Sequence, residues 1–167
     1  MISEDTVQAQ DMITRLANIL RYSLQKDRSH TVPLSSEVDA VSDYLALESV
    51  RFEDRLRVHL EMDDAVRQTA VPPMLLQTLV ENAIKHGVEE IASGGDLFIR
   101  AVRDGDALRI EVENAGSLSV PRPGATQIGL TNARERLRIL YGDGASLQLG
   151  ARGPGRVIAT ILIPSAT

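Results

Sequence analysis

The chain contains no cysteine and no tryptophan, and aromatic residues make up only 3% of its 167 positions. The lack of cysteine excludes disulfide scaffolds, thiolate zinc sites and cysteine nucleophiles. Aliphatic side chains must therefore form the core. No apolar run approaches the roughly 20 residues of a membrane-spanning helix. The polar N-terminal stretch also lacks the basic-then-apolar layout of a secretory signal.

A basic excess is missing as well, because the formal net charge is -5. This charge argues against nonspecific binding to nucleic acid, which needs a basic surface. Any anionic ligand must be held locally, by a metal ion, a helix N-terminus or a few well-placed cations. The length suits one ordinary domain, or a small domain with a helical attachment.

The first third of the sequence predicts two amphipathic helices. Apolar residues recur at helical spacing from about Thr6 to Gln25. A polar break, residues 26–33, separates this first helix from a second one that runs to Phe52. The second helix is predicted to start at Ser35 or Ser36, either of which could cap it. Two such helices joined by a short loop predict an antiparallel hairpin that needs a further partner to cover its apolar faces.

The remaining sequence alternates between strand and helix patterns. Residues 56–62 predict a strand with one wet face, and Pro73 is well placed in the first turn of a helix that reaches His86. Further strands are expected at residues 97–103, 108–113, 147–149 and 157–163, a helix at 130–140, and a long loop at 115–128. Together they predict a sheet with helices packed on one face.

The helix near residue 80 carries a polar stripe beside its apolar face. Thr78, Asn82 and Lys85 share this stripe, and His86 lies at its boundary. An amide oxygen such as that of Asn82 is a suitable ligand for Mg²⁺, and a lysine one turn away offers a point charge for a phosphate. The same spacing also fits an ordinary exposed polar face.

Several ordered motifs then resemble one family. LVENAIKHG, residues 79–87, resembles the N-box of histidine kinases, which belong to the ATPase superfamily of gyrase, Hsp90 and MutL. The flanking stretches LANILRYSL (16–24), VPLSSEV (32–38), YLALESVRFEDRL (44–56) and IGLTNARERLRILYG (128–142) are similar to the LytS-type branch. The resemblance runs from about Leu16 to the end of the chain.

This resemblance implies an α+β fold: a two-layer α/β sandwich of the Bergerat type, with a mixed sheet, helices on one face and a two-helix hairpin before it. Residues 1–55 would be a remnant of the dimerisation and phosphoacceptor region, and residues 56–167 the ATP-binding catalytic domain. ATP would lie between the helices and a mobile lid, residues 115–128. Asn82 would hold Mg²⁺, with Lys85 and His86 near the phosphates. Helical phase turns Glu81 away from that stripe.

The family's glycine-rich motifs keep only some of their glycines in this sequence. In NAGSL, residues 114–118, Asn114 occupies the position of the aspartate that reads the adenine amino group, Gly116 keeps the first glycine, and Leu118 replaces the second. Without the neighbouring motifs the same residues would read as a strand-end turn. At the start of the next helix the expected phosphate contacts are Ile128, Gly129, Leu130, Thr131 and Asn132.

The family's phosphoacceptor motif, Asn-Pro-His-Phe-Leu-Phe-Asn, is absent from this sequence. His30 and His59 lack a neighbouring carboxylate on a helix that would orient an imidazole nucleophile. The resemblance therefore implies an ATP-dependent protein-histidine kinase module that binds Mg·ATP but does not phosphorylate itself. The arginines of the last helix, Arg134, Arg136 and Arg138, are expected on a solvated face.

Two alternatives stay open. The thinned glycine motifs also fit a nucleotide-free docking scaffold, and the superfamily includes serine kinases of the anti-sigma type and gyrase-class ATPases. By resemblance, the intact kinase would be a homodimer that passes phosphate to a response regulator. Regulators with a LytTR DNA-binding domain are one candidate class. This fragment would lie in the cytoplasm, with membrane spans only in upstream segments of a parent membrane protein.

Overall fold

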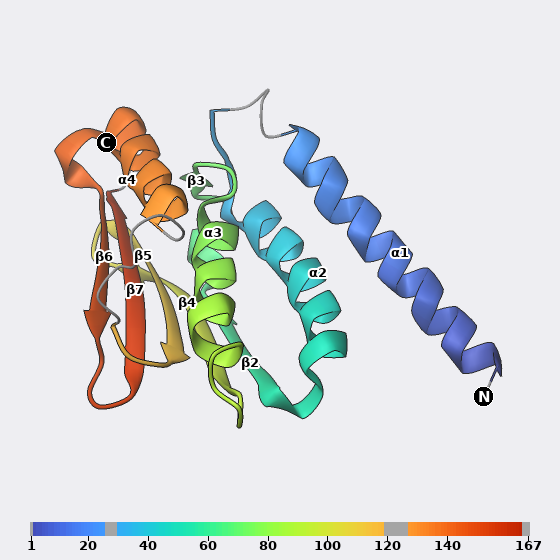
Figure 1. Ribbon diagram of the computed structural model, residues 1–167. Helices are drawn as coiled ribbons and strands as arrows, with labels where there is room; N and C mark the ends of the chain where they lie inside the picture. The colour runs from blue at the N-terminus through green and yellow to red at the C-terminus, as the bar shows by residue number, and fades with distance from the viewer. Residues whose placement is uncertain (1, 26–29, 119–126, 165–167) are drawn as a thin grey trace.

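The computed structural model describes residues 2–25, 30–118 and 127–164 (Figure 1). The helices are α1 (Ile2–Gln25), α2 (Leu34–Phe52), α3 (Leu75–Ala83), α4 (Gln127–Tyr141), a π-helical turn η4 (Ile84–Val88) and the short turns η2 (Glu53–Arg55), η3 (Asp64–Val66) and η5 (Gly142–Gly144). The strands are β1 (Val32–Pro33), β2 (Leu56–Met62), β3 (Ala70–Val71), β4 (Gly95–Asp104), β5 (Ala107–Ala115), β6 (Ser146–Ala151) and β7 (Arg156–Pro164).

Five strands form one mixed sheet in the order β2-β4-β5-β7-β6, and β1 pairs with β3 in a small second sheet. β2 runs parallel to β4, whereas the other neighbours in the large sheet are antiparallel. A parallel pair needs a crossover connection, and here that connection contains α3. The predicted mixed sheet is confirmed, and α3 is the helix that joins its parallel strands.

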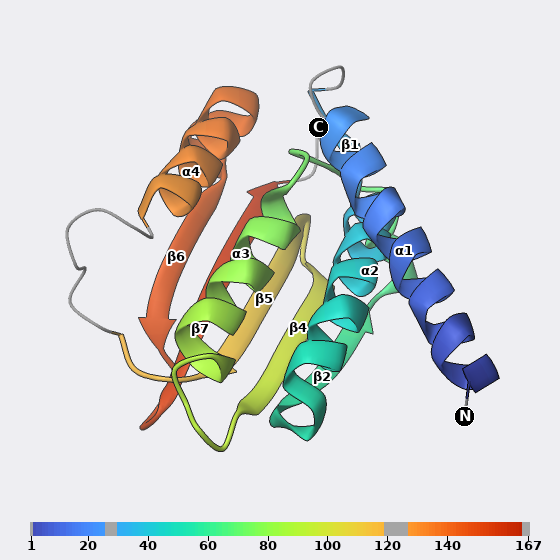
Figure 2. The ribbon, with the colours of Figure 1, turned by 45° about the vertical axis from the view of Figure 1, so that its right-hand side comes forward.

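The two faces of the large sheet differ in what covers them. Helices α2, α3 and α4 lie over one face (Figure 2). The strand residues beneath them are aliphatic and buried: Leu97, Ile99, Ala101, Leu108, Ile110, Val112, Leu147, Ala159, Ile161 and Ile163. The opposite face, called the open face below, carries Arg57, His59, Glu61, Asp96, Phe98, Arg100, Glu111, Glu113 and Arg156. This alternation follows from the two-residue period of a strand.

α1 and α2 form the predicted antiparallel hairpin, but they are buried very differently. The apolar stripe of α2 joins the same buried cluster as the sheet. On α1, by contrast, Val7, Ile13, Leu16, Leu20 and Leu24 are each at least 50% exposed. None of the described helices combines the length and hydropathy needed to cross a bilayer.

Three predicted helix starts are wrong. α2 begins at Leu34 with no side-chain cap, so neither Ser35 nor Ser36 caps it. α3 begins at Leu75 after Met74, whose left-handed φ of 64° places Pro73 outside the first turn. α4 begins at Gln127, three residues before the predicted start.

The predicted long loop therefore ends sooner than expected, and most of it, residues 119–126, lies outside the described residues. The expected wet and dry faces of β2 are also less distinct than predicted. Val58 and Leu60 are 36% and 42% exposed, because β2 is an edge strand that the helices cover only partly. β1 and β3 were not predicted, since two residues are too few to show an alternating pattern.

Candidate functional site

The candidate site is built around α3 and the π-helical turn η4 that continues it. Leu76, Leu79, Val80 and Ala83 bury one side of α3 in the core. Asn82 lies on the neighbouring side, and its Oδ1 is shielded from solvent without a hydrogen-bond partner among the described residues. More than nine in ten buried polar groups in proteins have a partner, so this unpaired acceptor is unusual. A cation that reaches it would satisfy it.

The turn η4 changes the helical phase directly after Asn82. Single π-helical turns inserted in α-helices are frequent at functional sites. Lys85 is exposed in this turn and His86 is partly exposed. The Nδ1 of His86 lies 3.2 Å from the Oε1 of Glu90. Lys85 and His86 therefore lie at the end of the helix that carries Asn82.

The end of β5 packs directly against this turn. Asn114 is only 6% exposed, and its Nδ2 donates to the carbonyl oxygen of Ala115 at 2.7 Å. A Cβ added to Gly87 would lie 2.6 Å from that Nδ2, so only glycine fits where η4 meets the strand. Gly116 has φ 147°, and its N–H donates to the oxygen of Gly155 at 2.9 Å.

The start of α4 borders the same region from the other side. A Cβ added to Gly129 would lie 3.2 Å from the Cγ2 of Thr78, so the first turn of α4 lies against α3. Ile128, Thr131 and Asn132 are exposed there, whereas the side chain of Leu130 is buried in the core and leaves only its backbone to a ligand. The free N–H groups of a first helical turn form a natural anion site.

The three arginines of α4 are exposed as predicted, yet two of them also make defined contacts. Arg134 donates through Nε to the oxygen of Leu147 at 3.1 Å, and Arg136 through Nη1 to the oxygen of Pro73 at 3.0 Å. Arg138 pairs with Glu135. Arg136 thus joins α4 to the segment that leads into α3.

The structure therefore brings the predicted residues of three separate segments together. Thr78 and Asn82 lie on α3, Asn114 and Gly116 at the end of β5, and residues 128–132 at the start of α4. An amide oxygen can ligate a divalent cation, and a helix N-terminus can bind phosphate, so this arrangement offers groups suited to a nucleoside triphosphate.

Sequence reasoning missed two charged residues that contact this unit. Glu37 of α2 is fully buried, and its carboxylate accepts the backbone N–H groups of Met74 at 2.6 Å and Leu76 at 2.8 Å. Burial raises the pKa of Glu37, and the hydrogen bonds from Tyr22, Met74 and Leu76 oppose that rise. In the sequence Glu37 looks like an ordinary acid in the first turn of its own helix, so no local signal reveals this contact.

Arg55 of η2 is the second such residue. Its Nη2 donates to the carbonyl oxygen of Val88, the last residue of η4, at 3.1 Å and to that of Ile91, just beyond η4, at 3.0 Å. The two acceptors lie more than 30 residues further along the chain. Only the fold places them beside this guanidinium.

Comparison with known proteins finds similarity to histidine kinases. The histidine kinase family profile matches residues 1–56. The sensor histidine kinase BtsS of Escherichia coli K12 is 31% identical over 164 residues, which are 98% of this chain and 29% of that protein. The sensor histidine kinase/phosphatase LytS of Staphylococcus aureus is 29% identical over 175 residues, 97% of this chain and 30% of that protein.

Solved structures give the same fold. The catalytic domain of histidine kinase ThkA superimposes with a TM-score of 0.63 at 18% identity, covering 82% of this chain and 97% of that domain. The histidine kinase AdeS of Acinetobacter baumannii gives 0.61 at 14% identity, covering 93% and 77%. The chain is a homologue of the sensor histidine kinases. It spans somewhat less than a third of the length of BtsS and LytS.

For a sensor histidine kinase homologue, the position of each histidine matters. Helices α1 and α2 contain none. His30 is exposed before β1, and His86 belongs to the candidate site. His59 lies on the open face, where its ring stacks on Phe98 at 4.5 Å between centroids and its Nε2 contacts Asp96 at 2.9 Å.

The residues fit a magnesium ion that is shared with nucleotide phosphates. Among the described residues there is no group of three or more histidine or acidic side chains that could hold a metal by itself. Mg²⁺ usually keeps several waters and takes only one or two protein ligands beside substrate phosphates. The unpaired Oδ1 of Asn82 could supply one such ligand.

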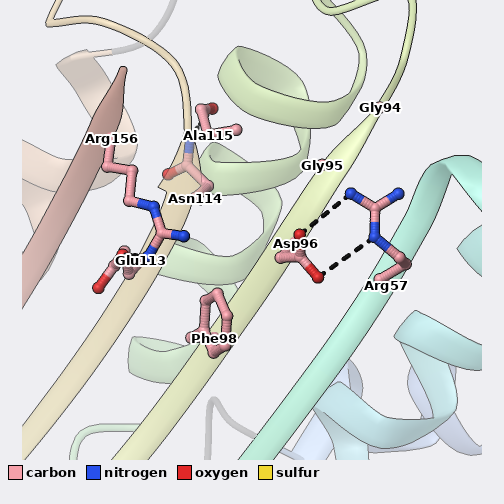
Figure 3. Close-up of a pocket in the computed structure, with 9 residues that line it drawn as sticks. All are labelled: Arg57, Gly94, Gly95, Asp96, Phe98, Glu113, Asn114, Ala115 and Arg156. Atoms are coloured by element: carbon pink, nitrogen blue, oxygen red, sulfur yellow. Dashed lines mark hydrogen bonds and ion pairs between the residues drawn. The ribbon is translucent and has the colours of Figure 1, made fainter. Parts of the chain in front are cut away.

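The open face of this kinase homologue has its own hollows. One cavity of about 130 Å³ lies beside the strand end that carries Asn114 (Figure 3). Arg156 reaches across it to Glu113, with Nη1 2.7 Å from Oε1, and Arg57 pairs with Asp96. The cavity is smaller than ordinary ligand sites of about 300–1,000 Å³, and its charged groups already pair with one another. A second hollow of about 320 Å³ on the same face is lined mostly by charged side chains, among which Arg152 pairs with Glu111 and Glu113.

Proposed function

We propose that this chain binds Mg·ATP among α3, the end of β5 and the start of α4, as the catalytic domain of a two-component sensor histidine kinase. The observation that carries the proposal is the buried Oδ1 of Asn82, which has no partner among the described residues. The homology to BtsS and LytS supports it independently.

Each group then has a distinct task. Asn82 would hold Mg²⁺, which shares the nucleotide's phosphates and lowers their charge when bound. The first-turn N–H groups of α4, with Thr131 and Asn132, would receive phosphate oxygens. Asn114 would accept from the adenine amino group, and Gly116 would allow close approach of the base. Lys85 adds a positive charge near the phosphates.

Such a site transfers a phosphoryl group mainly by positioning it and neutralising its charge. The acceptor would be a histidine outside α1 and α2, because these helices contain none. By homology we further propose that the intact kinase is a homodimer, that a response regulator of the LytTR type receives the phosphate, and that segments outside this chain reach the membrane.

A docking scaffold without nucleotide is the second candidate. Leu118 stands where the family has a glycine, and the side chain of this leucine is 51% exposed near the expected base. Asn114 stands where the family has an aspartate, so its neutral amide oxygen would replace the stronger charge-assisted acceptor. Both features would weaken nucleotide binding without harming the fold.

Titration calorimetry with Mg·ATP separates the two candidates. We expect measurable binding by the unmodified chain and a loss of at least about tenfold in Asn82→Ala, since removing groups of a metal site commonly costs 10–100-fold. Gln148→Ala removes an exposed amide from β6 and serves as the control. Undiminished affinity in Asn82→Ala would contradict the assigned site. Absence of heat with the unmodified chain at millimolar nucleotide would favour the scaffold.

A further inference from the structure

The unit formed by α3 and η4 is held at both ends by side chains from the preceding helical segment. At its N-terminal end, Glu37 accepts the N–H groups of Met74 and Leu76. α3 has no side-chain cap of its own, because its N-cap residue is Met74. The first N–H groups of a helix have no partner within the helix, so Glu37 of α2 supplies the missing cap.

At the other end, Arg55 donates to the carbonyl oxygens of Val88 and Ile91. Arg51, one turn earlier, pairs with Glu89. A carboxylate therefore faces the N-terminus of the α3–η4 unit and a guanidinium faces its C-terminus. This arrangement matches the sign of the helix dipole at each end.

Glu37 has one further partner, and that partner lies on α1. The hydroxyl of Tyr22 donates to Glu37 Oε1, the same oxygen that receives the N–H of Met74. α1 otherwise reaches α2 through exposed or half-buried polar contacts, such as Arg15 and Asn18 on Asp43. The apolar side chains of α1 stay largely exposed, so burial fixes its position only weakly.

We propose that Glu37 and Arg55 are positioning residues of the nucleotide site, and that the Tyr22 hydroxyl makes the hold of Glu37 on α3 depend on where α1 lies. This inference rests on the proposed function, because it concerns the placement of Asn82. A helix moves as a rigid rod over two turns, so a shift at Met74 displaces Asn82. A movement of α1 would therefore change nucleotide affinity without any residue of α1 touching the nucleotide.

The burial of Glu37 favours this role over simple stabilisation. A carboxylate in an aliphatic core is costly unless every oxygen is satisfied, and apolar residues of equal volume often stabilise as well or better. Here the carboxylate is satisfied only when α1, α2 and the start of α3 are all in place. Such a contact specifies one relative position of three helices.

Hydrogen exchange of the Leu76 amide tests the hold directly. This N–H donates to the carboxylate of Glu37, because the N–H groups in the first turn of a helix have no partner within the helix. In Tyr22→Phe, which keeps the ring and removes only the hydroxyl, we expect this amide to exchange about tenfold faster and the Mg·ATP affinity to fall about three- to tenfold, the equivalent of one hydrogen bond. Tyr44→Phe is the control, because Tyr44 is another half-buried tyrosine and lies two turns after Glu37 on α2. It should change neither the exchange rate of the Leu76 amide nor the Mg·ATP affinity.

Further variants and outcomes keep the test decisive. Arg55→Lys, with Arg57→Lys as its neighbour control, should also weaken Mg·ATP binding, since a single ammonium holds the two carbonyls less rigidly. Glu37→Gln combined with Tyr22→Phe should give less than the sum of the two losses, because both act on one contact.

Unchanged exchange at Leu76 in Tyr22→Phe would overturn the inference, and so would faster exchange with unaltered affinity. If the unmodified chain binds no Mg·ATP, the proposed function fails and the link to the site fails with it. The exchange rate of the Leu76 amide would then still show separately whether the Tyr22 hydroxyl stabilises the contact between Glu37 and the start of α3.

Discussion

The two faces of the large sheet follow different physical rules. The covered face is a continuous aliphatic layer in which Leu97, Ile110 and Ile161 are at most 1% exposed. The open face carries cross-strand ion pairs, among them Arg57 with Asp96 and Arg156 with Glu113, around the ring of Phe98. The covered face excludes water, whereas the open face carries paired charges that remain in contact with water.

This difference shows where to look for function. Hydrogen bonds from Arg57 and His59 lower the pKa of Asp96 to about 2, and the described hollows lie on the same open face. Shifted pKa values mark ion-pair networks as well as active sites. On the covered face, two buried amide oxygens of α3 lack a hydrogen-bond partner among the described residues, those of Gln77 and Asn82, and the one at Asn82 lies on the polar stripe of the candidate site.

Substitutions at two adjacent positions of β4 should separate the faces most strongly. Ile99 is 3% exposed on the covered face, whereas Arg100 is exposed on the other. We expect Ile99→Ala to lower the free energy of unfolding by about 2–5 kcal/mol, because it leaves a cavity in a packed core. Arg100→Ala should stay within about 0.5 kcal/mol. Urea unfolding measures both, and equal losses would contradict the contrast between the faces.

Asp96 should reveal the open face through pH. Its lowered pKa means that the ionised carboxyl stabilises the folded state above its ordinary pKa of 3.8, and that this contribution is lost as the pH falls towards about 2. We expect Asp96→Asn to be less stable than the unmodified chain at pH 6 by less than about 1 kcal/mol, since the pair is partly exposed.

The stability gap should narrow as the pH falls from about 4 towards 2. Urea unfolding at pH 6 and at pH 3 measures the gap. A gap of equal size at both pH values would mean that the ion pair does not lower this pKa.

Arg156→Ala should have the smallest effect on binding. The side chain contacts Glu113 and lies over Phe98, both on the open face. We expect the Mg·ATP affinity to stay within about twofold, because sites without shared partners act independently. Calorimetry checks this beside Asn82→Ala, and a large loss in Arg156→Ala would place part of the nucleotide site on the open face.

Much of this fold was predictable from local patterns. The alternation in residues 97–103 and 108–113 located β4 and β5, and Asp104-Gly105-Asp106 predicted the hairpin turn between them. The stripe that ends in Phe52 identified the buried side of α2. The residues of the candidate site were also predicted, because the motif around Asn82 is contiguous in the sequence and resembles a known family.

The long-range contacts could not be predicted. α3 starts at Leu75 because Met74 turns into the left-handed region and a carboxylate 39 positions before Leu76 caps the helix. No helical or alternating period connects Glu37 with that N–H, or Arg55 with Val88. The boundary between residues 55 and 56 stays a prediction, although one buried cluster includes Phe52 and Leu56 together.

The tip of the β4–β5 hairpin offers a practical advantage. Gly105 has φ 60°, and nothing lies within 4 Å of where its side chain would begin. β4 runs over ten residues from Gly95, at the end of the sheet where Ala115 lies, to Asp104, so roughly 30 Å of strand separates the two ends. A fluorophore or epitope inserted after Gly105 could thus report on the whole molecule while leaving the ligand end untouched.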